Sequence, residues 1–211
     1  MKTAGLILAA GMSSRMGSFK PLIELNGKKM IDWTIENMLQ GGAEKVIVVI
    51  GNKRAQMQRW LLKYDISLVQ PVFNGDFASG EILDSIKCGV RELKRQEFER
   101  FFLLLADLPA VSVNTFERLS KVYDQCGKKI AIASVHGKRR HPQLISMEMA
   151  EHILDYEGKG GLRGFWRYVE GEIADVKIND PGCEMDADTP EDLICLKSYM
   201  QKIKKKGKPV E

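Results

Sequence analysis

The sequence contains little that would indicate a zinc site, a disulfide framework or a membrane segment. It has four cysteines and three histidines in 211 residues, and the cysteines lack the C-x-x-C spacing of zinc sites and redox motifs. The apolar run near the start ends at Gly11, too early for a signal sequence with its cleavage site or for a membrane span. We therefore expect a soluble, cytoplasmic protein with reduced thiols.

A strong charge bias is also absent from most of the chain. The formal net charge is +4, but residues 197–211 hold six lysines and one glutamate, so the rest of the chain carries −1. The basic charge therefore belongs to a tail. We expect a single domain over residues 1–201, a flexible basic tail over residues 202–211, and no specific nucleic-acid or membrane partner. A tail that binds nucleic acid through its lysines is the alternative.

Short apolar runs alternate with longer segments of helical period through the first two thirds of the chain. The predicted strands are Gly5–Ala9, Val46–Ile50, Ile66–Val69, Phe101–Leu105 and Ile130–Ser134. The predicted helices between them are Ile31–Leu39, Ala55–Leu62, Leu83–Leu93 and Val113–Val122. This alternation is typical of βαβ units and predicts an α/β fold, a three-layer α/β/α sandwich around a Rossmann-like, mostly parallel sheet.

The regular alternation stops after His136. Residues 136–182 are rich in glycine and proline, and we interpret them as an insertion within the same domain that shapes a second pocket. Beyond it, Pro190 fits the first turn of a last helix, which either Asp188 or Thr189 would cap.

The segment after the first predicted strand has the composition of a phosphate-binding loop. In an open α/β sheet, ligands bind beyond the carboxyl ends of the strands, and the sequence there reads AAGMSSRMGSFK over residues 9–20. Gly11 and Gly17 allow a tight turn with inward-facing amides, and Arg15 and Lys20 add two positive charges, so the loop suits a triphosphate. It matches neither the Walker motif nor the dinucleotide fingerprint. A solvated turn is the alternative.

Asp107 is the acidic residue whose position best fits this loop. It follows the strongly apolar run Phe101–Leu105 directly, so its carboxylate should lie beside the loop. Transfer of a nucleotidyl group is opposed by charge repulsion, which a divalent cation held by carboxylates relieves. Oxygen ligands of this kind favour Mg²⁺ shared with substrate phosphates. A turn-forming aspartate before Pro109 is the alternative.

The string from Leu8 to Leu22 resembles the motif of the MobA-like NTP transferase family, on the side of its molybdenum cofactor cytidylyltransferases. The resemblance implies that Arg15 and Lys20 bind the triphosphate and that Lys20 steadies charge during transfer. Ala10 is similar to the cytidylyltransferase branch, since the guanylyltransferases usually carry a glycine there. The resemblance therefore favours CTP, with GTP as the alternative.

The same resemblance implies the metal ligands. An aspartate at the position of Asp107 is the family's usual Mg²⁺ ligand, and the string DADTPEDL at residues 186–193 is similar to the family's D-x-D-T-P-E-D-L segment. That match makes Asp188 the second ligand, although a purely capping role at the helix start is the alternative. Lys20, Arg15 and Asp107 are therefore the expected catalytic residues.

Three further segments complete the expected site. NGDFASG at residues 74–80 and RRHP at residues 139–142 are similar to family segments, whereas GGLRG at residues 160–164 departs from the family pattern because Gly161 replaces an acidic residue. The resemblance implies a nucleotide-binding set of Leu8, Ala9, Ala10, Gly11, Arg15, Lys20, Asn74 and Gly80. It implies an acceptor-binding set of Arg140, His141 and Arg163.

The resemblance implies transfer of CMP from CTP to a phosphorylated acceptor, with release of pyrophosphate. Molybdopterin is the expected acceptor, and a molybdoenzyme client is a further expected partner. The altered segment at residues 160–164 leaves a sugar, isoprenoid or alcohol phosphate open as the acceptor. A non-catalytic nucleotide- or cofactor-binding accessory protein is the remaining alternative.

Overall fold

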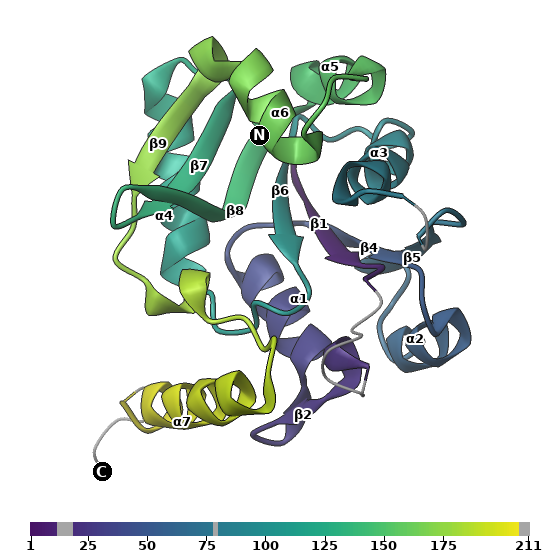
Figure 1. Ribbon diagram of the computed structural model, residues 1–211, viewed down its shortest axis with the longest axis vertical. Helices are drawn as coiled ribbons and strands as arrows, with labels where there is room; N and C mark the ends of the chain where they lie inside the picture. The colour runs from purple at the N-terminus through teal and green to yellow at the C-terminus, as the bar shows by residue number, and fades with distance from the viewer. Residues whose placement is uncertain (12–18, 78–79, 207–211) are drawn as a thin grey trace.

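One mixed sheet organises the protein. The computed structural model describes residues 1–11, 19–77 and 80–206, the last three of them without side chains. The strands of the sheet are β1 (Thr3–Ala9), β4 (Lys45–Ile50), β5 (Val69–Phe73), β6 (Arg100–Leu105), β7 (Ile130–Val135), β8 (Lys138–Ser146) and β9 (Ile173–Lys177). Their order is β5-β4-β1-β6-β8-β7-β9 (Figure 1). Only β8 runs antiparallel to its neighbours in this sheet, so the prediction of a mostly parallel sheet is confirmed.

Helices pack on both faces of the sheet. The helices α1 (Met30–Gln40), α2 (Arg54–Leu61) and α4 (Val113–Cys126) contribute to one apolar cluster. The helices α3 (Ile82–Leu93), α5 (Ala150–Asp155) and α6 (Gly161–Tyr168) contribute to the other. Because side chains alternate across a strand, Ile7 of β1 enters the first cluster and Leu6 the second. The three-layer α/β/α sandwich predicted from the sequence is therefore confirmed.

The last helix, α7 (Pro190–Lys206), packs away from the sheet beside the hairpin of β2 (Glu24–Leu25) and β3 (Lys28–Lys29) (Figure 1). A separate small apolar cluster holds it there, formed by Leu25, Met30, Ala110, Ala187, Leu196 and Met200. Ala187 is fully buried in this cluster, which fixes the position of the aspartates on either side of it. No helix in the described ranges is long and apolar enough to cross a membrane.

The hydrogen bonds at the start of α7 identify the residue that caps it. Thr189 Oγ1 accepts a hydrogen bond from the Asp192 amide at 3.2 Å, and the Asp192 carboxylate accepts one from the Thr189 amide at 2.8 Å. This reciprocal capping box satisfies backbone donors of the first turn. Thr189 is therefore the cap, and the carboxylate of Asp188 serves a different contact.

One predicted strand is misplaced in the sequence analysis. The run Ile66–Val69 was expected to be extended, but the strand is Val69–Phe73. Asp65 explains the shift, because its carbonyl accepts hydrogen bonds from the amides of Leu68 and Val69 and its carboxylate accepts one from the Ser67 amide, which makes a turn. The strand that follows contains Pro71, which an edge strand tolerates.

Residues 136–182 contribute more to the sheet than the sequence indicated. β8 lies between β6 and β7, and β9 pairs with β7 at the edge. The first half of β8, KRRHP, is polar, whereas its second half is buried between two neighbouring strands. An alternating or continuous apolar pattern is thus missing from half of this strand, which hid it. The helix α7 extends to Lys206, so the structure is helical into the segment expected as a tail.

A glycine between the sheet and α7 offers a test of this packing. A Cβ atom at Gly182 would lie 2.0 Å from the backbone oxygen of Ala110. We expect Gly182→Ala to lower the free energy of unfolding by about 1–3 kcal/mol, because backbone atoms must shift. Urea unfolding measures this. The control is Gly171→Ala, where an added Cβ meets nothing within 4 Å; equal stability of the two variants would contradict the packing described.

Candidate functional site

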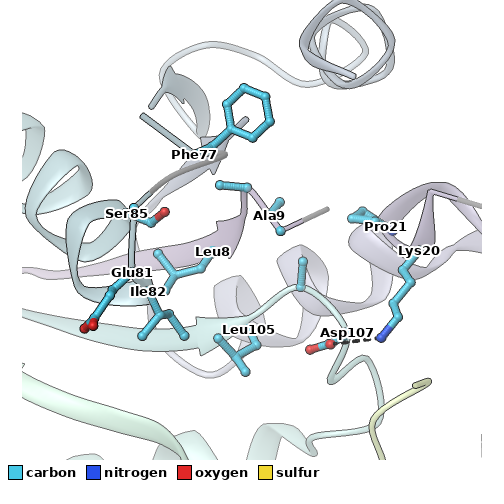
Figure 2. A pocket seen from close by; sticks show the side chains of 14 residues that line it. Leu8, Ala9, Lys20, Pro21, Phe77, Glu81, Ile82, Ser85, Leu105 and Asp107 are labelled. Atoms are coloured by element: carbon cyan, nitrogen blue, oxygen red, sulfur yellow. Dashed lines mark ion pairs between the residues drawn. The ribbon is translucent and has the colours of Figure 1, made fainter. Parts of the chain in front are cut away.

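A cleft of about 310 Å³ opens where β1 and β6 end. These two strands are paired in parallel, with Leu8 opposite Leu105, so the segments that follow them emerge side by side. The cleft is lined by Leu8, Ala9, Ala10, Gly11, Lys20, Pro21, Phe77, Gly80, Glu81, Ile82, Ser85, Leu105, Ala106 and Asp107 (Figure 2). Its position at the carboxyl ends of parallel strands is where an α/β fold binds ligands.

Most of the predicted nucleotide-binding residues meet in this cleft. Those that line it are Leu8, Ala9, Ala10, Gly11, Lys20 and Gly80. Asn74 does not line the cleft but contacts a residue that does. Its buried side chain donates a hydrogen bond at 3.0 Å to the Oγ atom of Ser85, which lines the cleft. Arg15 falls outside the described residues.

The charged end of the cleft is built around Lys20. Its side chain is only 8% exposed, because the short 3-10 helix Lys20–Leu22 turns it inward. The Lys20 ammonium forms an ion pair with Asp188 and lies 3.8 Å from Asp107 Oδ2. Figure 2 shows the side chains of Lys20 and Asp107 pointing toward one another. The predicted lysine and both predicted metal ligands are thus in one place, from segments far apart in the sequence.

Two of the aspartates near Lys20 have raised pKa values. Burial raises the pKa of Asp107, with Asp186 and Asp188 raising it further and Lys20 opposing them. Burial also raises the pKa of Asp186, and the nearby Asp188 adds to the effect. Among the described residues, three neighbouring carboxylates thus lie around the buried Lys20 ammonium. A further cation would stabilise their ionised forms.

The residues present fit a divalent cation that takes part of its ligands from a substrate. Asp107 Oδ1 is buried and has no hydrogen-bond partner, so an oxygen ligand remains available. Within residues 1–11, 19–77 and 80–206, no group of three or more His, Cys, Asp or Glu residues is arranged to hold a metal ion. Two carboxylates with phosphate oxygens and water are the ligand set that Mg²⁺ commonly uses.

The other end of the cleft is mainly apolar, with the polar side chains of Glu81 and Ser85 beside it (Figure 2), and the sequence analysis missed most of these residues. Phe77, Ile82 and Leu105 contribute side chains there, and Figure 2 shows them on the side of the cleft away from Lys20. A flat base can pack against such surfaces while its phosphates face the charged end. The sequence held a partial signal, since Phe77 and Ile82 flank the predicted Gly80, but nothing in it singled out Leu105.

A second cavity of about 630 Å³ adjoins the first and shares Leu105 with it. Its other lining residues are Leu108, Arg139, Arg140, His141, Gln143, Leu162, Arg163, Trp166, Arg167, Cys183, Glu184 and Asp186. All three residues predicted to bind the acceptor are in this set. Trp166 is buried and also lines this cavity.

The arginines of the second cavity differ in their partners. Arg139 is bound by Glu170 and Asp175, and Arg140 donates to Glu184 Oε1 at 2.8 and 2.9 Å. Arg163 and Arg167 are exposed on α6, where no ion pair to them is found among the described residues. Arg167 was not predicted, and its helical spacing of four residues from Arg163 was the signal that could have found it.

His141 lines the second cavity as a neutral ring. Burial lowers the pKa of His141 to about 4, while the backbone oxygen of Leu103, 3.3 Å from Nδ1, opposes this effect. That contact places the proton of the neutral ring on Nδ1, which donates to the carbonyl. His141 is therefore suited to hydrogen bonding through Nε2 and not to binding an anion by charge.

Comparison with known proteins agrees with this geometry. The family model described as the MobA-like NTP transferase domain matches residues 5–175. The molybdenum cofactor cytidylyltransferase of Escherichia coli (strain K12) is 27% identical over 200 residues, which cover 94% of this chain and 97% of that protein.

Solved structures show the same fold. A nucleotidyl transferase from Methanothermobacter superimposes with a TM-score of 0.79 at 21% identity, over 96% of this chain and 99% of the other. A Mycobacterium tuberculosis H37Rv protein in complex with manganese superimposes with a TM-score of 0.66 at 21% identity, over 94% of this chain and 99% of the other. At these identities the comparison concerns the fold.

The buried histidine gives a test of the second cavity by pH. The unfolded chain takes up a proton on His141 near the ordinary value of 6.5, whereas the folded protein does so only near 4. Stability is therefore lost as the pH falls through this window, by up to about 3 kcal/mol. We expect His141→Gln to show a shallower loss than the wild type in urea unfolding between pH 6.5 and 4. The control is His136→Gln, on the exposed turn before β8; an unchanged slope in His141→Gln would refute a neutral buried ring.

Proposed function

The chain belongs to the MobA-like NTP transferase family, and from that premise we propose that this nucleotidyltransferase transfers CMP from CTP to a phosphorylated acceptor. The observation that carries the proposal is the pairing of the buried Lys20 with Asp188 and Asp107, at the charged end of a cleft that Gly11 also lines. The reaction needs cations around a triphosphate and a place for a metal, and this group supplies both.

In the proposed reaction an acceptor phosphate oxygen attacks the α-phosphorus of CTP. The new phosphorus–oxygen bond forms as the bond to the β-phosphate oxygen breaks, and pyrophosphate leaves with the electron pair. Lys20 would neutralise charge on the triphosphate, and Asp107 with Asp188 would hold Mg²⁺, which offsets the negative charge that develops on the phosphates. Arg15 is proposed as a second triphosphate ligand on the resemblance of its loop.

The proposal of CTP as the donor depends on a small residue at the base end. Ala10 lines the cleft beside the apolar surface of Leu8 and Ile82, and its likeness to the cytidylyltransferase branch supports a pyrimidine. The similarity to the E. coli molybdenum cofactor cytidylyltransferase supports the same donor. GTP is the alternative, and it would need more room than a pyrimidine at this end.

The second cavity is the proposed acceptor site. It meets the first across Leu105, so an acceptor bound there can present a phosphate oxygen to the donor. Arg163 on α6 would bind the anionic group, with Arg140 and His141 on β8 facing the same space. We propose molybdopterin as the acceptor and a molybdoenzyme as client, with a sugar, isoprenoid or alcohol phosphate as the alternative.

Removal of the central charges tests the catalytic proposal. We expect Lys20→Ala and Asp107→Asn each to reduce pyrophosphate release by about 100-fold or more, because each removes charge stabilisation in a site withdrawn from water. The assay crosses CTP, GTP, ATP and UTP with molybdopterin and other phosphorylated acceptors.

A matched substitution separates this effect from a general change in charge. Asp155→Asn removes a carboxylate at the exposed end of α5 and should leave turnover unchanged. Circular dichroism and thermal unfolding verify that the variants are folded. Near-wild-type turnover in folded Lys20→Ala and Asp107→Asn would exclude the proposed mechanism.

The acceptor site is tested by a change in one kinetic constant. We expect Arg163→Ala to raise the KM for the acceptor by about tenfold, and to leave the KM for CTP within twofold of the wild type, because a charge-assisted contact to an anion is lost on one side only. Arg95→Ala, at the exposed end of the segment after α3, is the control. A rise confined to the KM for CTP would place the acceptor elsewhere.

A further inference from the structure

Lys20 occupies the space between two carboxylates that a metal ion would need. Its ammonium is paired with Asp188 and lies 3.8 Å from Asp107 Oδ2, and the side chain is buried. Among the residues that the structure describes, the Lys20 ammonium is thus a cation that offsets the charge of these carboxylates. A cation of either kind can satisfy these oxygens, so the lysine and a metal ion compete for them.

The two cations cannot share this arrangement at low cost. A divalent ion bound to Asp107 and Asp188 would lie within a few ångströms of the Lys20 ammonium, and like charges at such distances repel strongly in a partly buried site. Lys20 and the Oδ1 atom of Asp107 are buried, so solvent screens this repulsion less than it would at the surface. The metal ion therefore binds well only after the ammonium has moved.

We propose that Lys20 is an internal counter-ion that keeps the metal site closed until a nucleotide arrives. This inference rests on the proposed function, since it takes Asp107 and Asp188 to be the metal ligands. The triphosphate enters next to Gly11 at the same end of the cleft and offers the ammonium a new anionic partner. Lys20 then leaves Asp188, and the carboxylates accept the metal ion.

The long side chain of lysine makes this exchange feasible without a change of backbone. The ammonium ends a flexible four-carbon stem, while Pro21 and the short 3-10 helix hold the Lys20 backbone in place. In the nucleotide-free protein the two contacts of the Lys20 ammonium, with Asp188 and with Asp107, link the segment before α7 to the segment after β6, so one ammonium both blocks the metal and positions its ligands.

Binding of Mn²⁺ alone tests the proposal. The free ion is measured by electron paramagnetic resonance while nucleotide-free, full-length protein is titrated. We expect the wild type to bind Mn²⁺ weakly and Lys20→Met to bind it about tenfold tighter or more, because the competing charge is gone. Lys20→Gln should behave like Lys20→Met and serves if the first variant does not fold. Addition of CTP to the wild type should lower free Mn²⁺ by more than the sum of what CTP alone and protein alone bind.

Two variants identify the origin of the effect. Lys53→Met is the control, because it also removes a lysine near the site: the Lys53 ammonium lies over the ring of Phe19, the residue before Lys20. This variant should leave Mn²⁺ affinity unchanged. Lys20→Met combined with Asp188→Asn should return the affinity to the weak wild-type level, because a ligand is lost. Tight Mn²⁺ binding by the nucleotide-free wild type, or equal affinity in wild type and Lys20→Met, would overturn the proposal.

Pyrophosphate release by the wild type separates this proposal from the function on which it rests. If the wild type turns over CTP but Lys20→Met binds Mn²⁺ no more tightly than the wild type, the counter-ion role is overturned and the proposed function stands. Tighter Mn²⁺ binding by Lys20→Met without turnover of any NTP would support the counter-ion role and overturn the proposed reaction.

Discussion

The pairing of the buried Lys20 ammonium with Asp188, close to Asp107, is the interaction on which the site depends. Charges leave water at a high cost, and a buried charge that loses its partner is strongly destabilising. Each member comes from a different part of the chain: Lys20 follows the loop after β1, Asp107 follows β6, and Asp188 precedes α7. The group can therefore form only when the sheet and the last helix are both in place, and this ties assembly of the site to completion of the fold.

Two features of the fold hold these segments together. The parallel register of β1 and β6 places the residues after Leu8 and Leu105 side by side, while the apolar cluster under α7 buries Ala187 and so fixes the backbone between Asp186 and Asp188. Neither feature contains a residue that is proposed to bind the metal ion or the phosphates. Packing on one side and backbone pairing on the other thus determine where the charges meet, and this explains how hydrophobic residues far from a ligand can control its binding.

The sequence was most informative where local structure and function coincide. The apolar run that ends before Asp107 and the glycine-rich string that ends at Lys20 were each readable because a strand end in a parallel sheet is also a ligand-binding position. The sequence did not show whether Asp188 or Thr189 caps α7, since aspartate and threonine both cap helices. The hydrogen bonds between Thr189 and Asp192 identify Thr189 as the cap. The antiparallel β8 was hidden because its polar half faces a cavity, so that the demands of the site interrupt the apolar pattern of a strand.

The two cavities place different constraints on what each can bind. In the first, a buried lysine is paired with partly exposed carboxylates, so a ligand must exchange partners with them, as a triphosphate accompanied by a metal ion would under the proposed function. In the second, Glu170, Asp175 and Glu184 already neutralise the arginines of β8, whereas the exposed side chains of Arg163 and Arg167 line the cavity from α6. Anion binding there depends on α6, the element whose sequence departs from the family pattern at Gly161. The proposed donor site thus lies at the ends of two strands of the sheet, whereas the proposed acceptor site depends on α6, whose opposite face packs in the core.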